Sequence, residues 1–192
     1  MSTQSTSKPM PFLNRLALVH PVDPTTINPY AVLRDIFQTD SSTGFIQQFR
    51  ESCQSALSQN YAWKEGCPGN LLFLHERLEM LLEACYLIYV QKSGSKKKWL
   101  PLKKKYFKKL ALPCPLSMQE LDNPYLVLES FFSYRGLREW KQDMHEWLEA
   151  GLSNQTVSEI IEPESLLPYC RYMEKLVAAA GWLLLCHKKP AA

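Results

Sequence analysis

Hydrophobic side chains recur every three or four positions in six stretches of the chain, which is the spacing of one face of an α-helix. Val32, Leu33, Ile36 and Phe37 form the first of these apolar stripes. The six stretches are 32–37, 45–57, 71–91, 127–132, 140–152 and 166–187. Runs of alternating apolar and polar residues, which are typical of β-strands, are scarce. The pattern therefore predicts an all-α protein with six helices.

The two halves of the chain repeat each other at a fixed offset of 95 residues. Asn-Pro-Tyr at 28–30 returns at 123–125, and the stripe at 32–37 returns at 127–132 without a gap. Two units with equivalent apolar faces can bury those faces against each other. We therefore expect an internally duplicated helical bundle, in which two three-helix units are related by approximate twofold symmetry.

The repeat also predicts how the chain is divided. Residues 1–11 form a polar leader rich in Ser, Thr and Pro, which we expect to be flexible. Repeat unit 1 covers 12–92, a basic connector covers 93–105, and repeat unit 2 covers 106–188. One shared core and two separate lobes are both compatible with this division. The apolar third helices favour a shared core.

Each unit has a recognisable helix start. Asn28 and Asn123 are placed to cap a helix, because an Asn side chain accepts hydrogen bonds from free backbone N–H groups. Pro29 and Pro124 follow at the first helical position, where proline is best tolerated. Upstream of these starts, the sequence predicts extended, proline-bounded segments, which include residues 15–24.

Composition agrees with a folded chain, with 46% hydrophobic and 21% charged residues. The first dozen residues are polar and contain proline, so we expect no signal peptide and a cytoplasmic protein. The longest uncharged apolar run, 176–186, has eleven residues, whereas a membrane-spanning helix needs roughly 20. We therefore expect no transmembrane segment.

The residues give no sign of catalysis, a metal or a cofactor. The six cysteines show no C-x-x-C pairing, so we interpret them as free thiols. Glu79 and Glu174 coincide in the repeat, but they lack the histidine companions of a di-iron bundle. No histidine has a nucleophile in a known catalytic context, and no phosphate-binding glycine loop is present. We therefore predict a protein that is not an enzyme.

Charge is concentrated in one segment. Residues 84–119 contain nine lysines and no acidic residue, and without these lysines the chain has 13 basic against 19 acidic residues. Lysines interleaved with aromatic residues suit a phosphate backbone and unpaired bases, although the same composition also suits a solvated linker, or contact with an acidic protein or an anionic lipid surface. The candidate anion or nucleic-acid contacts are Lys96, Lys97, Lys98, Trp99, Lys103, Lys104, Lys105, Lys108 and Lys109.

Aromatic residues accumulate in the second unit. Trp147 stands where the first unit has Ser52, and Tyr172 stands where it has Arg77. Core packing accounts for such residues, but an exposed Trp147 beside Tyr172 would make a contact for a partner protein. Our leading interpretation is a non-enzymatic adaptor that binds another macromolecule. The alternative is a lysine-rich regulatory protein that binds nucleic acid. Neither interpretation fixes the oligomeric state.

Overall fold

The computed structural model describes residues 13–19, 27–57, 68–93, 114–153 and 156–187. The described residues form nine helices and no strand, which confirms the all-α prediction for this part of the chain. The helices are α1 (Asn14–Val19), α2 (Pro29–Thr39), α3 (Ser42–Leu57), α4 (Pro68–Ser93), α5 (Met118–Asp122), α6 (Tyr125–Tyr134), α7 (Leu137–Leu152), α8 (Val157–Ile160) and α9 (Pro163–His187). No helix in these ranges is long and apolar enough to cross a membrane.

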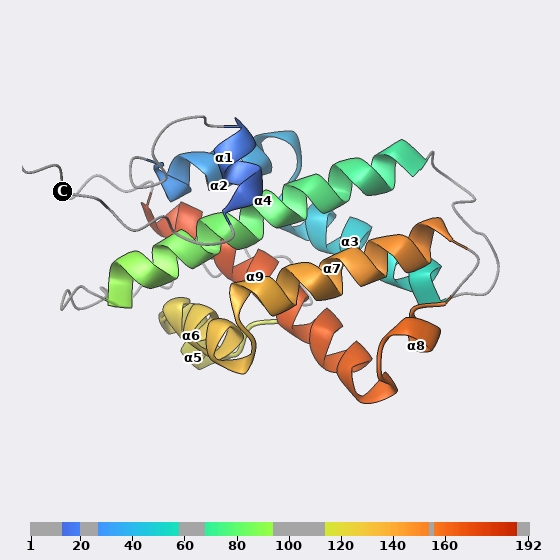
Figure 1. Ribbon diagram of the computed structural model, residues 1–192. Helices are drawn as coiled ribbons and strands as arrows, with labels where there is room; N and C mark the ends of the chain where they lie inside the picture. Colours follow the sequence, from blue (N-terminus) through green and yellow to red (C-terminus); the bar gives the residue numbers. More distant parts are fainter. Residues whose placement is uncertain (1–12, 20–26, 58–67, 94–113, 154–155, 188–192) are drawn as a thin grey trace, which may run out of the picture.

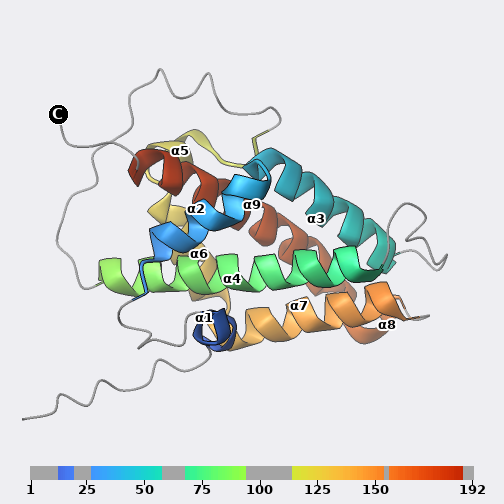
Figure 2. The same ribbon diagram turned by 90° about the horizontal axis from the view of Figure 1, so that it is seen from above.

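The two longest helices, α4 and α9, run through the bundle, and the other helices pack around them (Figure 1). Helix α3 from the first half packs against α9 and α7 from the second half, and α7 packs against α4 from the first half. Figure 2 shows the same interleaving from above. The main core cluster contains residues of both halves, among them Leu33, Leu81, Phe131 and Leu176, all fully buried. The halves therefore share one core.

The helices of the two halves have closely related bounds. Helices α3 and α7 each contain 16 residues, and both ends of α7 lie 95 positions after those of α3. Helices α4 and α9 begin 95 positions apart and contain 26 and 25 residues. The hydroxyl groups of Tyr30 and Tyr125, which are also 95 positions apart, are hydrogen-bonded to each other at 2.9 Å.

Three short helices, α1, α5 and α8, add to the six predicted ones. The prediction of an extended segment at 15–24 was wrong for residues 15–19, because these residues belong to the helix Asn14–Val19. Residues 20–24 lie outside the described residues. The reason for this helix is a carboxylate on α4. Glu83 accepts the backbone N–H groups of Arg15 at 3.0 Å and Leu16 at 2.8 Å, which are free in the first turn of a helix.

The predicted helix starts had different outcomes. Asn28 caps α2 as expected, since its side chain accepts from the N–H groups of Tyr30 and Ala31 and Pro29 is the first helical residue. The prediction for Asn123 was wrong. Asn123 is instead the C-terminal cap of α5, where its backbone N–H donates to the Gln119 carbonyl oxygen. Helix α6 begins at Tyr125 without a side-chain cap.

Candidate functional site

The lysine-rich candidate site lies outside the described residues. This applies to Lys96, Lys97, Lys98, Trp99, Lys103, Lys104, Lys105, Lys108 and Lys109. Lys92, at the end of α4, is the described lysine of this run. Its Nζ lies 3.3 Å from the centre of the Tyr125 ring, and burial lowers its pKa. Lys92 is thus engaged with an aromatic ring inside the protein.

Trp147 belongs to the core. Its side chain is only 6% exposed and stacks on the Tyr169 ring, with 4.9 Å between ring centres and 13° between ring planes. Tyr172 is partly buried and stacks on Tyr134 at 4.6 Å. Trp147 is buried because α7 packs against α3 and α4. The apolar face of α7 that carries Trp147 is therefore covered by other helices. It is therefore packed as a core residue, and it presents no exposed contact surface.

An exposed apolar surface lies elsewhere, at one end of the bundle. Its four residues occur in the last turns of α3 and α7 and in the first turns of α4. We call these four residues the bundle-end surface. They are Leu57 (45% exposed), Leu72 (46%), Phe73 (55%) and Leu152 (40%). Figure 2 shows the three helix ends gathered on one side of the molecule. Large apolar side chains at this level of exposure, gathered in one region, are typical of interaction sites.

The ends of α7 and α4 approach each other closely beneath this surface. A Cβ atom at Gly151 would lie 2.9 Å from a Leu71 methyl carbon. Position 151 therefore accepts glycine because a larger residue would push Leu71 aside. The close contact fixes the relative position of the two helix ends that carry Leu152 and Leu72.

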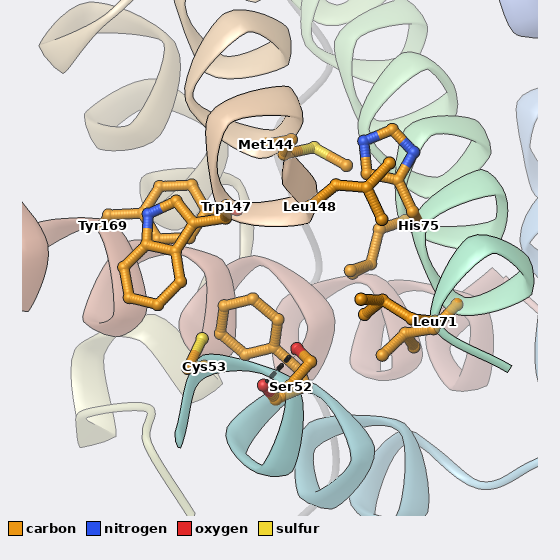
Figure 3. A pocket seen from close by; sticks show the side chains of 11 residues that line it. Ser52, Cys53, Leu71, His75, Met144, Trp147, Leu148 and Tyr169 are labelled. Carbon is orange, nitrogen blue, oxygen red and sulfur yellow. Dashed lines mark hydrogen bonds between the residues drawn. The ribbon is translucent and has the colours of Figure 1, made fainter. Parts of the chain in front are cut away.

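A pocket opens between the same helices (Figure 3). It encloses about 340 Å³ of space outside the protein atoms, including the open solvent at its mouth. Apolar side chains dominate its lining. The lining residues are Phe49, Ser52, Cys53, Leu71, Leu74, His75, Leu78, Met144, Trp147, Leu148 and Tyr169. Leu71 lines the pocket from the same turns of α4 that carry Leu72, so the pocket and the bundle-end surface lie at the same end of the bundle.

The polar groups of the pocket do not converge on one point. In Figure 3 the indole nitrogen of Trp147 and the imidazole of His75 lie at opposite sides. Neither Trp147 Nε1 nor His75 Nε2 has a hydrogen-bond partner among the residues that the structure describes. Burial lowers the pKa of His75, which keeps its imidazole neutral near pH 7. The Ser52 hydroxyl donates to the Phe49 carbonyl oxygen at 2.7 Å and does not contact His75. No nucleophile and base are thus paired here.

The glutamates that coincide in the repeat have protein partners. Glu79 Oε2 accepts from Arg15 at 3.1 Å, and Glu174 binds Arg50 through both carboxylate oxygens at 2.6 and 2.7 Å. Glu51 and Glu146 accept from glutamine side chains on their own helices. Within the described ranges, no three His, Cys, Asp or Glu side chains gather in a way that could hold a metal ion.

Known proteins do not identify this site. Comparison with protein families, with curated proteins and with solved structures finds no match.

The repeat did not reveal the bundle-end surface. Leu57 matches Leu152 and Leu72 matches Leu167, and all of these leucines continue apolar stripes that predict a buried helix face. A signal was present for one of them, since Leu72 and Glu76 are four positions apart and thus share a helix face. An apolar residue beside a charged one on a helix face is a candidate for exposure.

Proposed function

We propose that this protein is a non-enzymatic adaptor that binds a partner protein through the bundle-end surface. The observation that carries the proposal is the exposure of four large apolar side chains at one end of the bundle, where an apolar pocket also lies. Binding energy in protein interfaces comes mainly from a few apolar or aromatic anchors that fill such recesses. Apolar side chains of the partner pack against Leu57, Leu72, Phe73 and Leu152.

The pocket supports this function better than the binding of a cofactor or substrate. Pockets for drug-sized ligands enclose roughly 300–1,000 Å³ and combine apolar walls with polar groups that fix one orientation. Here about 340 Å³ already includes the solvent at the mouth, and the polar groups lie at opposite sides. An apolar contact with a partner protein needs no converging polar groups.

The double substitution Leu72→Glu and Phe73→Glu tests the adaptor function. We expect the partner's affinity to fall by about 30-fold or more, since burying either new carboxylate is costly and two apolar anchors are lost. The measurement is capture of partners from cell extract by wild-type protein, followed by titration of the identified partner.

Leu167→Glu is the matched control, because Leu167 is 57% exposed and stands 95 positions after Leu72 on α9. This variant should bind the partner as the wild type does. Equal loss of binding in both variants, or a partner retained at full affinity by the double variant, contradicts the proposal.

A nucleic-acid-binding function is the second candidate, and the lysine run supports it. Nine lysines without an acidic residue between 84 and 119 give this segment the charge that a phosphate backbone attracts. The absence of arginine from the same stretch favours binding without base-specific contacts.

Lys103→Gln, Lys104→Gln and Lys105→Gln together test this candidate. If the segment binds nucleic acid, wild-type affinity for single-stranded RNA or DNA should decrease steeply between 50 and 200 mM salt, by roughly a hundredfold or more, and the triple variant should show a shallower slope. Fluorescence anisotropy with a labelled oligonucleotide measures both effects. Binding that is absent at low salt, or that does not change with salt, eliminates this candidate.

We also infer that the chain arose by duplication of a three-helix unit and that its halves are related by an approximate twofold axis. Support comes from the helix bounds 95 positions apart, the reciprocal packing of α3 on α9 and α7 on α4, and the contact between the equivalent residues Tyr30 and Tyr125. An experimental structure in which no single rotation superposes α2, α3 and α4 on α6, α7 and α9 would refute the duplication.

We also propose a cytoplasmic location for the protein, and fractionation of cells that produce it tests this location.

A further inference from the structure

Two cysteine side chains from opposite halves of the chain meet where α3 packs against α9. Cys53 on α3 is 6% exposed, and Cys170 on α9 is partly exposed. The thiol groups of Cys53 and Cys170 lie within hydrogen-bonding reach of each other. A disulfide between them requires the two sulfur atoms to move from this contact to bonding distance.

Neighbouring contacts hold the two cysteines in register. The Phe49 and Tyr169 rings lie 6.0 Å apart, centre to centre. Arg50 binds both carboxylate oxygens of Glu174, at 2.6 and 2.7 Å. Both pairs join α3 to α9 within about one helical turn of the cysteines, so the sulfur atoms are held opposite each other by contacts on either side.

Cys170 is the more exposed of the two cysteines and the one that a small oxidant reaches first. Cys170 is partly exposed at the surface, and Cys53 lines the pocket that opens to solvent (Figure 3). The hydrogen bond from Cys53 lowers the pKa of Cys170, and the same bond together with burial raises the pKa of Cys53. Cys170 is therefore the thiol that ionises first, and the thiolate is the form that attacks an oxidant.

We propose that Cys53 and Cys170 form an oxidisable dithiol, which hydrogen peroxide converts into a disulfide between α3 and α9. The Cys170 thiolate attacks one peroxide oxygen, breaks the O–O bond and becomes a sulfenic acid, and the hydroxide released takes up the proton that Cys170 lost. The Cys53 sulfur then attacks the Cys170 sulfur, and the sulfenic hydroxyl leaves with the Cys53 proton as water. The dithiol loses two electrons, and peroxide is reduced to two molecules of water.

The disulfide changes the protein by joining its two halves covalently. It links residues 117 positions apart, and a crosslink that closes a long loop restricts the unfolded chain strongly. It also fixes α3, one wall of the pocket, against α9. This inference is independent of the proposed adaptor function, because it depends only on the two sulfur atoms and the contacts around them.

Oxidation of the reduced full-length protein with an equimolar amount of hydrogen peroxide tests the proposal. We expect the intact mass to fall by two hydrogens and a non-reducing peptide map to show Cys53 joined to Cys170. The melting temperature should rise by about 5–15 °C over that of the reduced protein. Cys170→Ser should form no such disulfide, and Cys53→Ser should accumulate a sulfenic acid at Cys170 that dimedone traps.

Cys114→Ser is the matched control, since Cys114 is also partly exposed, and this variant should form the disulfide as the wild type does. The proposal is overturned if both cysteines remain open to alkylation at peroxide concentrations that oxidise Cys114. It is also overturned if the map joins either one to a different cysteine. Because the map uses wild-type protein, the outcome does not depend on whether a variant folds.

Discussion

Replacing Glu83 with alanine is expected to lower the free energy of unfolding by about 3–5 kcal/mol. The Glu83 side chain is fully buried in α4, and its carboxylate accepts the N–H groups of Arg15 and Leu16 and a contact from the Lys141 ammonium. The substitution leaves two backbone donors of α1 without their partner, and it leaves the largely buried Lys141 with the more distant Glu79 carboxylate at 3.9 Å. Unsatisfied buried groups cost more than the net gain of the original hydrogen bonds. Urea denaturation monitored by circular dichroism measures the change.

Two further variants separate this mechanism from a general loss of charge. Glu76→Gln removes a carboxylate that binds Arg15 at 3.2 Å but whose side chain is 50% exposed, so stability should change by less than about 1 kcal/mol. The double variant Glu83→Gln with Lys141→Met should be more stable than Glu83→Gln alone, because the largely buried ammonium that has lost its nearer carboxylate is also removed. A loss below about 1 kcal/mol for Glu83→Ala would show that α1 does not depend on this carboxylate.

The same carboxylate explains one limit of prediction from sequence. Helical periodicity correctly predicted the main helices, because stripes such as the one that contains Val32 and Leu33 are buried as one face of a helix. Helix α1 could not be predicted this way. Its first-turn N–H groups are satisfied by Glu83, which lies 67 residues after Leu16 in sequence. A cap supplied by a distant helix leaves no local signal.

The candidate site shows a second limit, which concerns burial. Leu57 and Leu152 match each other in the repeat and continue apolar stripes, yet both are exposed at helix ends. Trp147 replaces a serine and is nevertheless buried. Periodicity predicts which residues share one face of a helix. The positions of the neighbouring helices determine which turns of that face are buried. The pocket depends on the packing of four helices, so no single stretch of sequence could predict it.

Replacing Trp140 with alanine is expected to destabilise the protein by about 3–5 kcal/mol, which is a large part of the 5–15 kcal/mol typical of a folded domain. Trp140 is fully buried on α7. Its indole stacks on Phe131 with 4.1 Å between ring centres, and its Nε1 donates to the Phe131 carbonyl oxygen at 3.1 Å. Alanine leaves a cavity that these neighbours cannot fill and removes that hydrogen bond. The midpoint of urea unfolding should fall markedly.

Trp140→Phe distinguishes the two contributions, because Phe45 stands 95 positions earlier and is buried in the same core. Phenylalanine keeps most of the ring stacking and loses the N–H donor, so a cost of about 1–2 kcal/mol is expected. If both variants lower the free energy of unfolding by the same amount, the hydrogen bond accounts for most of the stability that Trp140 provides, and the cavity contributes little to the loss. If the alanine variant costs less than about 1 kcal/mol, α7 is not held in the core through this side chain. In that case the pocket wall formed by Met144 and Leu148 would lack its support.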